Sequence, residues 1–420
     1  MLQVTIGVIS KQLISNKVLT KKVLTKKIFT IFAYNINNKT KTIMIENPFE
    51  FGRAVEDECF TDRIEDAKRL EANLTHGINT ILISPRRWGK TSLVKKVISL
   101  SKRKDVKFIF VDVFSCKSDY EFCKMLATET IRQTSSKWDE WIQMAKTFLS
   151  NITPKFSFGT DPMNDFSLSF AWDPKDNPER EILQLPEKIA EKKGIKVVVC
   201  FDEFQQIADF KDSLTFQKKL RTVWQHQKLT TYCMFGSKKH LMTKLFHTTE
   251  CPFYKFGDIM FLDKIPETEW VPFICEKFKN TGKHIEEKQA LKICQVSENL
   301  SSLVQHLAWL TWYKASPEVT DQMIEQAIDE LLDQNRLFYQ RDMETMTVYQ
   351  KNFLIAVANG INSGLSRREV LNEYHLESSA NVQGVKKALI ARDFIDADGD
   401  IISFNDPFFK LWIKRNIAQL

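Results

Sequence analysis

The chain has 420 residues, of which 43% are hydrophobic and 11% aromatic, and its formal net charge is +7. This length predicts two or three domains with sizeable cores. No apolar run approaches the roughly 20 residues that a membrane-spanning helix requires, so we expect a soluble protein without a membrane partner. The eight cysteines form no Cys-x-x-Cys pair, which favours reduced core thiols in the cytoplasm over disulfides or a metal site.

The positive charge lies mainly at the start of the chain. Residues 1–43 contain eight lysines and no acidic residue, so the net charge does not by itself indicate a nucleic-acid-binding protein. Their Lys, Ile, Asn and Thr content is typical of an AT-rich leader that has been translated. A targeting peptide is the alternative, but the segment has no arginine and no apolar core with a small-residue cleavage site. We expect a basic leader outside the fold, with translation starting at Met44.

A phosphate-binding loop is the most informative feature of the sequence. An apolar run at residues 79–83 predicts a buried strand, and apolar residues at helical spacing between 93 and 100 predict a helix. Between them lies a Gly-Lys-Thr turn, which in such loops holds phosphates with backbone N–H groups and the helix dipole. The residues expected to contact the nucleotide are Ser84, Pro85, Arg86, Arg87, Trp88, Gly89, Lys90, Thr91 and Ser92.

This loop predicts ATP and Mg²⁺ as cofactors. Lys90 should reach the β- and γ-phosphates as a point charge, and the hydroxyl of Thr91 should hold the ion that bridges them. Ser84 stands where such loops usually have their first glycine. Because serine adopts positive φ less freely than glycine, the nucleotide affinity stays open.

A second half of the site follows at residues 196–203. Its continuous apolar run predicts a strand covered on both faces, and the run ends at Asp202 and Glu203. A strand that ends in a solvated acidic turn is the alternative. Together with the phosphate-binding loop, the two acids predict that Asp202 binds Mg²⁺ with Thr91 and that Glu203 polarises the attacking water.

Two further strands are predicted at residues 106–113 and 230–235. The second ends at Gly236-Ser237, and Ser237 is a candidate catalytic sensor between the γ-phosphate and the water, with an ordinary turn as the alternative. Four strands separated by helical segments predict a parallel, three-layer α/β sheet. Because sites in such sheets lie at the carboxyl ends of the strands, all three motifs should meet there.

Together these motifs resemble the prokaryotic AAA+ ATPases of the predominantly archaeal ATPase family, relatives of the signal-transduction ATPases with numerous domains. The resemblance covers roughly residue 46 to the C-terminus. It implies a P-loop NTPase core, a helical lid and a C-terminal winged helix, with adenine contacts at Phe60, Asp62 and Arg63. The matching strings are Asn47-Pro48-Phe49, Phe60-Thr61-Asp62-Arg63, Pro85-Arg86-Arg87, Gly89-Lys90-Thr91-Ser92-Leu93, Asp202-Glu203-Phe204-Gln205 and Gly236-Ser237.

Two positions depart from the pattern of these relatives. Residues 298–302, Glu-Asn-Leu-Ser-Ser, lack the Gly-x-Pro turn with which a lid helix senses nucleotide. Lys255 stands where relatives often place an arginine that reaches a neighbouring subunit. Lysine offers a point charge and not a planar fork, so the identity of any arginine finger stays open.

The pattern along the chain predicts four parts: the leader at 1–43, an ATPase core at 44–262, a helical lid at 263–342 and a winged helix at 343–420. Alternating residues in the core predict an inserted hairpin at about 154–173. We expect its aromatic side chains to pack in the core and not to stack on bases. The winged helix is indicated by three helical patterns followed by a hairpin with an Asp-Gly turn.

DNA could bind the third of these helices, residues 379–392, because the recognition helix of such domains enters the major groove. The polar residues it offers are Asn381, Gln383, Lys386, Lys387 and Arg392. The wing that follows is acidic at Asp396, Asp398 and Asp400, and would face phosphates with the wrong sign. We therefore favour a protein-docking or intramolecular role for the winged helix over DNA binding.

Three functions stay open at this point. We favour an enzyme that hydrolyses Mg-ATP, with catalytic roles for Lys90, Glu203 and Ser237, and that uses nucleotide state to reposition the lid and winged helix towards an unknown protein client. The alternatives are an ATP-dependent DNA-binding regulator or mobile-element helper, and a nucleotide-binding scaffold with little turnover. Neither the pathway nor the oligomeric state can be predicted from these motifs.

Overall fold

The computed structural model of the chain describes residues 47–52, 63–135, 138–149, 154–157, 167–170 and 178–417. The expected leader, the start at Met44, and two of the three expected adenine contacts, Phe60 and Asp62, lie outside these residues. Phe49–Leu420 form a single unit, separate from Met1–Pro48.

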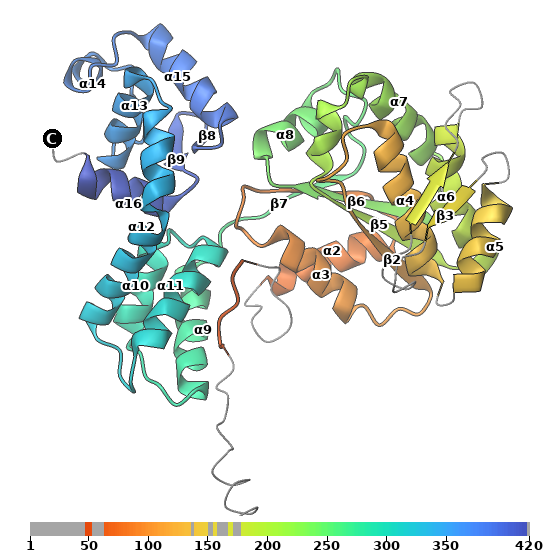
Figure 1. The fold of residues 1–420 in the computed structure, drawn as a ribbon, viewed down its shortest axis with the longest axis horizontal. Coiled ribbons are helices and arrows are strands. Elements are labelled where there is room, and N and C mark those ends of the chain that lie inside the picture. Colours follow the sequence, from red (N-terminus) through yellow and green to blue (C-terminus); the bar gives the residue numbers. More distant parts are fainter. Residues whose placement is uncertain are drawn as a thin grey trace, which may run out of the picture. The chain divides into compact units, whose positions relative to one another are not determined.

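A parallel sheet lies at the centre of the N-terminal half (Figure 1). Its five strands follow the order β2-β5-β6-β1-β7. They are β1 (Thr80–Ile83), β2 (Val106–Asp112), β5 (Lys196–Asp202), β6 (Thr230–Gly236) and β7 (Asp258–Phe261). The first four confirm the prediction from the sequence. β7 was not predicted, because this edge strand has four residues and only Met260 is buried, which leaves no recognisable apolar run.

Helices cover both faces of this sheet (Figure 1). α2 (Ile64–Thr75) and α3 (Lys90–Leu100) pack on one face. The other face carries α4 (Asp119–Thr134), α5 (Trp138–Phe148), α6 (Pro178–Lys193), α7 (Ser213–Trp224) and α8 (Lys239–His247). Successive strand residues point to opposite faces, so Leu82 joins the first cluster and its neighbours Ile81 and Ile83 the second. These layers are the predicted three-layer α/β fold.

An antiparallel pair of short strands joins the second of these clusters. β3 (Pro154–Ser157) pairs with β4 (Ser167–Phe170), in the region where the sequence predicts an inserted hairpin. Leu168 and Phe170 are buried among residues of α4 and α6. Phe170 therefore packs in the core.

Four helices form the lid: α9 (Glu267–Asn280), α10 (Glu287–Val296), α11 (Ser301–Lys314) and α12 (Asp321–Glu344). Phe49 is fully buried among them, with its ring centroid 5.7 Å from that of Phe278. The end of α12 reaches beyond the lid, because Tyr339 packs against Phe409 with ring centroids 5.1 Å apart. The lid and the C-terminal domain consequently share one hydrophobic core.

The C-terminal domain is a winged helix, as predicted. It contains α13 (Val348–Ala358), α14 (Arg368–Glu373), α15 (Ser379–Ala391), the hairpin of β8 (Ile395–Asp398) and β9 (Ile401–Phe404), and α16 (Pro407–Asn416). Asp398 pairs with Ile401 across the turn, and Gly399 takes the positive φ of 58° that such a turn needs. The last helix, α16, closes the domain against α12 and α13 and was not predicted.

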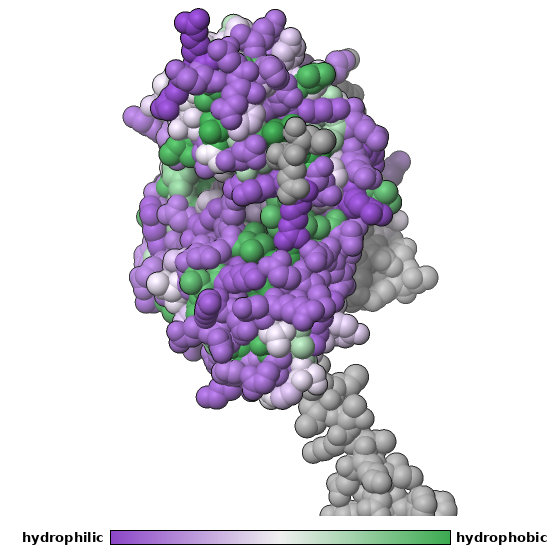
Figure 2. All heavy atoms as spheres, turned by 90° about the vertical axis from the view of Figure 1, so that its left-hand side faces the viewer, coloured by the Kyte–Doolittle hydropathy of each residue, from purple (hydrophilic) through white to green (hydrophobic). Residues whose placement is uncertain are grey.

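The surface at the left of Figure 1 is mainly hydrophilic, with separate small hydrophobic patches (Figure 2). Exposed large hydrophobic side chains of the lid and winged helix include Tyr313, Leu337, Phe338, Val348, Tyr349 and Ile401. Among the described residues, no helix combines the length and the apolar character needed to cross a membrane.

Candidate nucleotide site

The predicted phosphate-binding loop connects β1 to α3. Arg87 and Gly89, on either side of Trp88, have positive φ angles of 68° and 88°. Left-handed residues alternating with right-handed ones produce the backbone concavities that bind anions. Gly89 adopts this conformation without strain, whereas Arg87 needs its surroundings to hold it there. Ser84, which replaces the usual first glycine, is not among the residues with positive φ, so serine satisfies the backbone at this position.

Lys90 is buried in this loop. Its Nζ donates hydrogen bonds to the carbonyl oxygens of Ser84 and Pro85, both at 2.8 Å, and to Ser84 Oγ at 3.3 Å. Burial lowers the pKa of Lys90 to about 8, although the nearby carboxylates of Glu203 and Asp202 oppose this shift. The ammonium group is therefore held inside the loop, close to two acids and oriented by backbone oxygens.

The two expected metal ligands lie next to each other. Thr91 Oγ1 donates a hydrogen bond to Asp202 Oδ2 at 2.9 Å, across from α3 to the end of β5. The other oxygen, Oδ1, accepts one from the backbone N–H of Glu203 at 2.9 Å. Burial raises the pKa of Asp202 to about 6. A hydroxyl and a carboxylate oxygen are hard oxygen ligands of the kind that Mg²⁺ prefers, so this pair fits the predicted ion.

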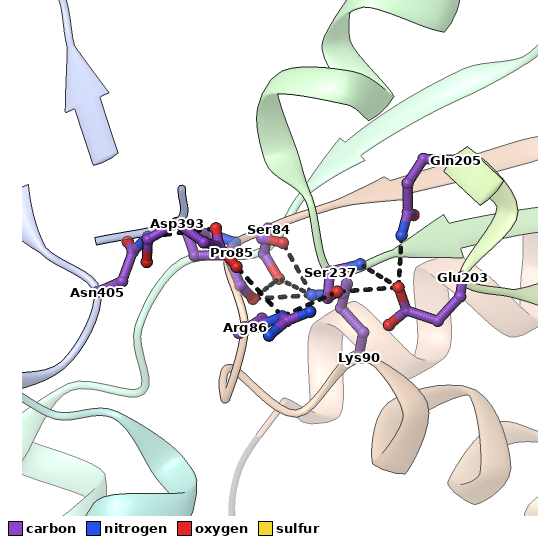
Figure 3. Close-up of polar contacts among 9 residues, drawn as sticks. All are labelled: Ser84, Pro85, Arg86, Lys90, Glu203, Gln205, Ser237, Asp393 and Asn405. Carbon is purple, nitrogen blue, oxygen red and sulfur yellow. Dashed lines mark hydrogen bonds and ion pairs between the residues drawn. The ribbon is translucent and has the colours of Figure 1, made fainter. Parts of the chain in front are cut away.

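Glu203 and Ser237 also meet, as the carboxyl ends of β5 and β6 would predict (Figure 3). Ser237 Oγ donates to Glu203 Oε2 at 2.9 Å, and Arg86 Nε donates to Ser237 Oγ at 3.2 Å. Gln205 Nε2 donates to the same carboxylate oxygen of Glu203. This role of Gln205 was not predicted, because an uncharged glutamine after the two acids carries no periodic or charge signal.

Arg63, for which the resemblance implies an adenine contact, has its guanidinium among backbone oxygens. It is only 6% exposed, and Nη2 donates to the carbonyl oxygens of Trp88 at 2.8 Å and Asp263 at 2.7 Å. Nη1 pairs with Asp66 at 3.0 Å. Arg63 thus connects the phosphate-binding loop to the segment after β7, and it also borders the cavity described next.

A cavity of about 860 Å³ opens at the carboxyl ends of the strands. Every expected contact from Arg86 to Ser92 borders it, together with Glu203 and Ser237. The rest of the wall includes Phe114, after β2, and Ile265, before α9. It also includes residues 50–52, the lid helices, and the winged helix with Asp406 and Phe408. In the lid, Ser301 and Ser302 belong to the segment that the resemblance connects with nucleotide sensing, whereas no motif predicted Gln305, His306 and Tyr339.

The wall residues from outside the core are fixed by their own contacts. Phe51 stacks on His306 with centroids 4.0 Å apart and planes 14° from parallel. The backbone N–H of Glu50 donates to Gln305 Oε1 at 3.0 Å. No sequence motif marks these residues, since each contact joins positions far apart in the chain.

Two arginines of the phosphate-binding loop pair with aspartates of the winged helix. Arg87 Nη1 lies 3.0 Å from Asp406 Oδ2, and Arg86 Nε lies 3.4 Å from Asp393 Oδ2 (Figure 3 shows the second pair). A third pair joins Lys239, at the start of α8, to Asp396 in the wing at 2.9 Å. Acidic residues of the winged helix therefore bind cations of the ATPase core.

Residues 298–302 and Lys255, the two positions that depart from the pattern of the relatives, each have their own contacts in the structure. Glu298 and Asn299 turn the chain between α10 and α11 with positive φ of 46° and 57°, and Glu298 pairs with Lys410 at 2.8 Å. Lys255 does not border the nucleotide cavity of its own chain. Its Nζ lies 5.3 Å from the ring centroid of Tyr254, on the wall of a separate cavity.

Comparisons with known proteins agree with this architecture. A family model described as "ATPase domain predominantly from Archaea" matches residues 60–293, and one described as "Probable winged helix domain" matches residues 337–415. A search of curated proteins found no match.

Solved structures share the fold. The Walker-type ATPase PABY2304 of Pyrococcus abyssi superposes with a TM-score of 0.62 at 14% identity, covering 87% of this chain and 99% of that one. The Aeropyrum pernix ORC2 protein, solved as ADPNP-ADP complexes, gives a TM-score of 0.54 at 14% identity, covering 88% of this chain and 98% of that one.

Proposed function

The chain belongs to the family of ATPase domains found predominantly in Archaea, and on this premise we propose that it hydrolyses Mg-ATP and uses the nucleotide to reposition its winged helix. One observation carries the proposal. Lys90, Thr91, Glu203 and Ser237 border one cavity at the ends of three strands, and Asp202 is joined to this group by its hydrogen bond with Thr91. Such a set supplies phosphate binding, metal binding and water activation.

The phosphates would lie on the loop backbone, with Lys90 Nζ exchanging its carbonyl partners for phosphate oxygens. Arg86 and Arg87 border the same cavity and add guanidinium groups suited to bidentate phosphate contacts. Thr91 Oγ1 and Asp202 would hold Mg²⁺, which neutralises charge on the β- and γ-phosphates when bound. The adenine of the nucleotide would lie near Phe51 and His306, which also border the cavity.

Glu203 is the proposed base for the attacking water. Its Oε2 already accepts hydrogen bonds from Ser237 and Gln205. Among the described residues, Oε1 of Glu203 has no hydrogen-bond partner, so it can accept a hydrogen bond from the attacking water. A positioned acceptor of this kind orients the nucleophile for in-line attack on the γ-phosphate. Ser237 would act as the sensor, because it contacts both Glu203 and Arg86.

The proposed switch depends on competition for the loop arginines. Carboxylates and phosphates bind a guanidinium with the same fork geometry, so Asp406 and Asp393 take the positions on Arg87 and Arg86 that phosphate oxygens could take. A ligand shifts a conformational equilibrium only if it binds one state better. ATP would bind better once these aspartates have left, and the winged helix would then move together with the lid, with which it shares a core.

Two substitutions test the chemistry. Lys90→Ala should lose ATP binding, because no other group replaces the buried ammonium. Glu203→Gln should bind ATP as wild type does but turn it over at least ~100-fold more slowly, the usual size of a lost general-base effect. Titration with a fluorescent ATP analogue and a phosphate-release assay measure the two properties. Lys104→Ala, at an exposed position after α3, is the control, and equal ATP affinity in wild type and Lys90→Ala would contradict the site.

A DNA-binding regulator is the second candidate, since Gln383 and Lys387 are exposed on α15. Two other cations of this region are already used within the domain: Lys386 donates to the carbonyl of Gly399 and Arg392 to Thr345 Oγ1. DNA binding that weakens with salt and is lost in Lys387→Ala would favour this candidate. ATP binding without measurable turnover would favour the third, a nucleotide-binding scaffold.

A further inference from the structure

Gln205 occupies an unusual position beside the proposed base. It lies in the short 3-10 helix η3 (Phe204–Asp209) and is only 3% exposed. Its Nε2 points at Glu203 and donates to Oε2 (Figure 3). Its other amide atom, Oε1, is buried without a hydrogen-bond partner. Because a carboxylate can only accept, the amide must present nitrogen to Glu203, and the oxygen is left facing protein.

Gly236, the last residue of β6, provides the space for this amide. A Cβ built on Gly236 would overlap Gln205 Oε1 and lie 2.8 Å from its Cδ. Gly236 is not among the glycines with positive φ, so its backbone conformation does not require glycine. Glycine is therefore required at position 236 because a Cβ there would overlap the side-chain amide of Gln205.

Packing does not explain why a glutamine is buried here. A buried amide oxygen without a partner costs folding free energy, and an apolar side chain of similar size would avoid that cost. The amide of Gln205 instead makes one hydrogen bond, to Glu203. Among the described residues, the proposed base is therefore the only hydrogen-bond partner of the Gln205 side chain.

We infer that Gln205 is a positioning residue that fixes the carboxylate of Glu203 for water activation, and that Gly236 is required to admit it. This inference rests on the proposed ATPase function. Gln205 Nε2 and Ser237 Oγ approach the same oxygen from two elements, η3 and the end of β6. With the backbone N–H of Ser237, which lies 3.4 Å away, three donors on Oε2 restrict the rotation of the carboxylate and leave Oε1 for the water. A side chain held in this way is already oriented when the nucleotide binds.

The test compares Gln205→Leu with wild type. Removing the donor should lower kcat for ATP on the order of 10- to 100-fold, as is typical for groups that orient a reactive ligand. The KM for ATP and the Kd of an ATP analogue should change less than about two-fold, and Tm should not fall, because leucine removes the unpaired oxygen. Gly236→Ala should lower kcat in the same way by displacing the amide.

Two further variants separate positioning from general damage. Gln206→Leu is the matched control, because the amide of Gln206, next in the chain, donates to exposed Asp209 at 3.4 Å and not to Glu203. Its kcat should stay at the wild-type value. In a Glu203→Gln background, Gln205→Leu should cause no further loss of kcat, because the effect acts through Glu203. A loss that adds fully to that of Glu203→Gln, or a wild-type kcat in Gln205→Leu, would overturn the inference.

A structural readout keeps the test independent of turnover. Crystal structures of wild type and Gln205→Leu should show Glu203 in one rotamer next to Ser237 only when the glutamine is present. If wild type binds ATP without hydrolysing it, the proposed enzymatic function fails, but the rotamer comparison still decides about Gln205. An unchanged Glu203 rotamer in the variant would overturn the inference whatever the activity.

Discussion

Arg87 in the phosphate-binding loop forms an ion pair with Asp406 at the start of α16, with Nη1 3.0 Å from Oδ2. The two residues are 319 positions apart in the chain. Asp406 also caps α16, because its Oδ1 accepts hydrogen bonds from the backbone N–H groups of Phe408 and Phe409. One oxygen of the carboxylate therefore serves the helix and the other the loop.

Asp406→Asn should strengthen ATP binding. Asparagine keeps a capping oxygen for α16 and removes the charge that Arg87 binds. We expect the affinity for ATP to rise by up to about five-fold, equivalent to the ~1 kcal/mol upper range of partly exposed ion pairs, because the phosphates no longer compete with a carboxylate. Isothermal titration with ATP measures the change.

The control for this substitution is Asp329→Asn. Asp329 pairs with Arg415 at 2.6 Å and is 60% exposed. Its substitution therefore removes one carboxylate charge that is not paired with the phosphate-binding loop. ATP affinity should not change in this variant. A value for Asp406→Asn equal to or below wild type would show that the winged helix does not compete with phosphate.

The proposed switch predicts a nucleotide-dependent change in hydrogen exchange. In Glu203→Gln, which should trap the unhydrolysed state, ATP should alter protection in residues 334–347 and in α15, compared with the apo and ADP forms. The reason is that release of Arg86 and Arg87 from their aspartates frees the winged helix together with the end of α12. Mass spectrometry of exchanged peptides measures this. Identical protection in all three forms would exclude the switch and favour the scaffold.

Thr91→Ala should raise the Mg²⁺ requirement of turnover. The hydroxyl of Thr91 lies 2.9 Å from Asp202 Oδ2, and its removal leaves the carboxylate as the main protein ligand. We expect the half-saturating Mg²⁺ concentration to increase on the order of ten-fold or more. Phosphate release measured across a Mg²⁺ series tests this. Thr222→Ala, at an exposed position of α7, is the control, and an equal Mg²⁺ requirement in Thr91→Ala and wild type would remove Thr91 from the metal site.

Protonation of His306 should lower the free energy of unfolding in mild acid. Burial lowers the pKa of His306 from its ordinary value of 6.5, with Glu330 opposing the shift. The unfolded chain therefore binds a proton at higher pH than the folded chain, so the free energy of unfolding decreases as pH falls through and below about 6.5. His306→Gln should lose this part of the pH dependence. Thermal unfolding between about pH 8 and 5 measures it.

Exposed His240 provides the comparison for this experiment. His240→Gln should retain the pH dependence of wild type, because it replaces a histidine that is not packed against another ring in the described structure. If His306→Gln and wild type lost stability equally in acid, the partly buried His306, stacked on Phe51, would not be the source of the pH dependence.

The sequence predicted the parts of the site that depend on local chemistry. Continuous apolar runs before Lys90, Glu203 and Ser237 indicated buried parallel strands, and in a parallel sheet the carboxyl ends of the strands lie at one edge. The convergence of these residues follows from that rule, and the structure brings them together. The short strand β7 escaped prediction because only one of its four residues is buried.

Contacts between distant segments were decided by the tertiary structure. The pairing of Arg87 with Asp406, the stack of Phe51 on His306 and the space that Gly236 leaves for Gln205 all join surfaces brought together by packing of whole elements. Hydrophobic periodicity shows which face of an element is buried, but not which polar side chains of a separate element will lie opposite. The sequence by itself therefore determined the fold class and the identity of the phosphate-binding loop. Only the tertiary structure determined which groups orient Glu203 and which carboxylates bind the arginines of that loop.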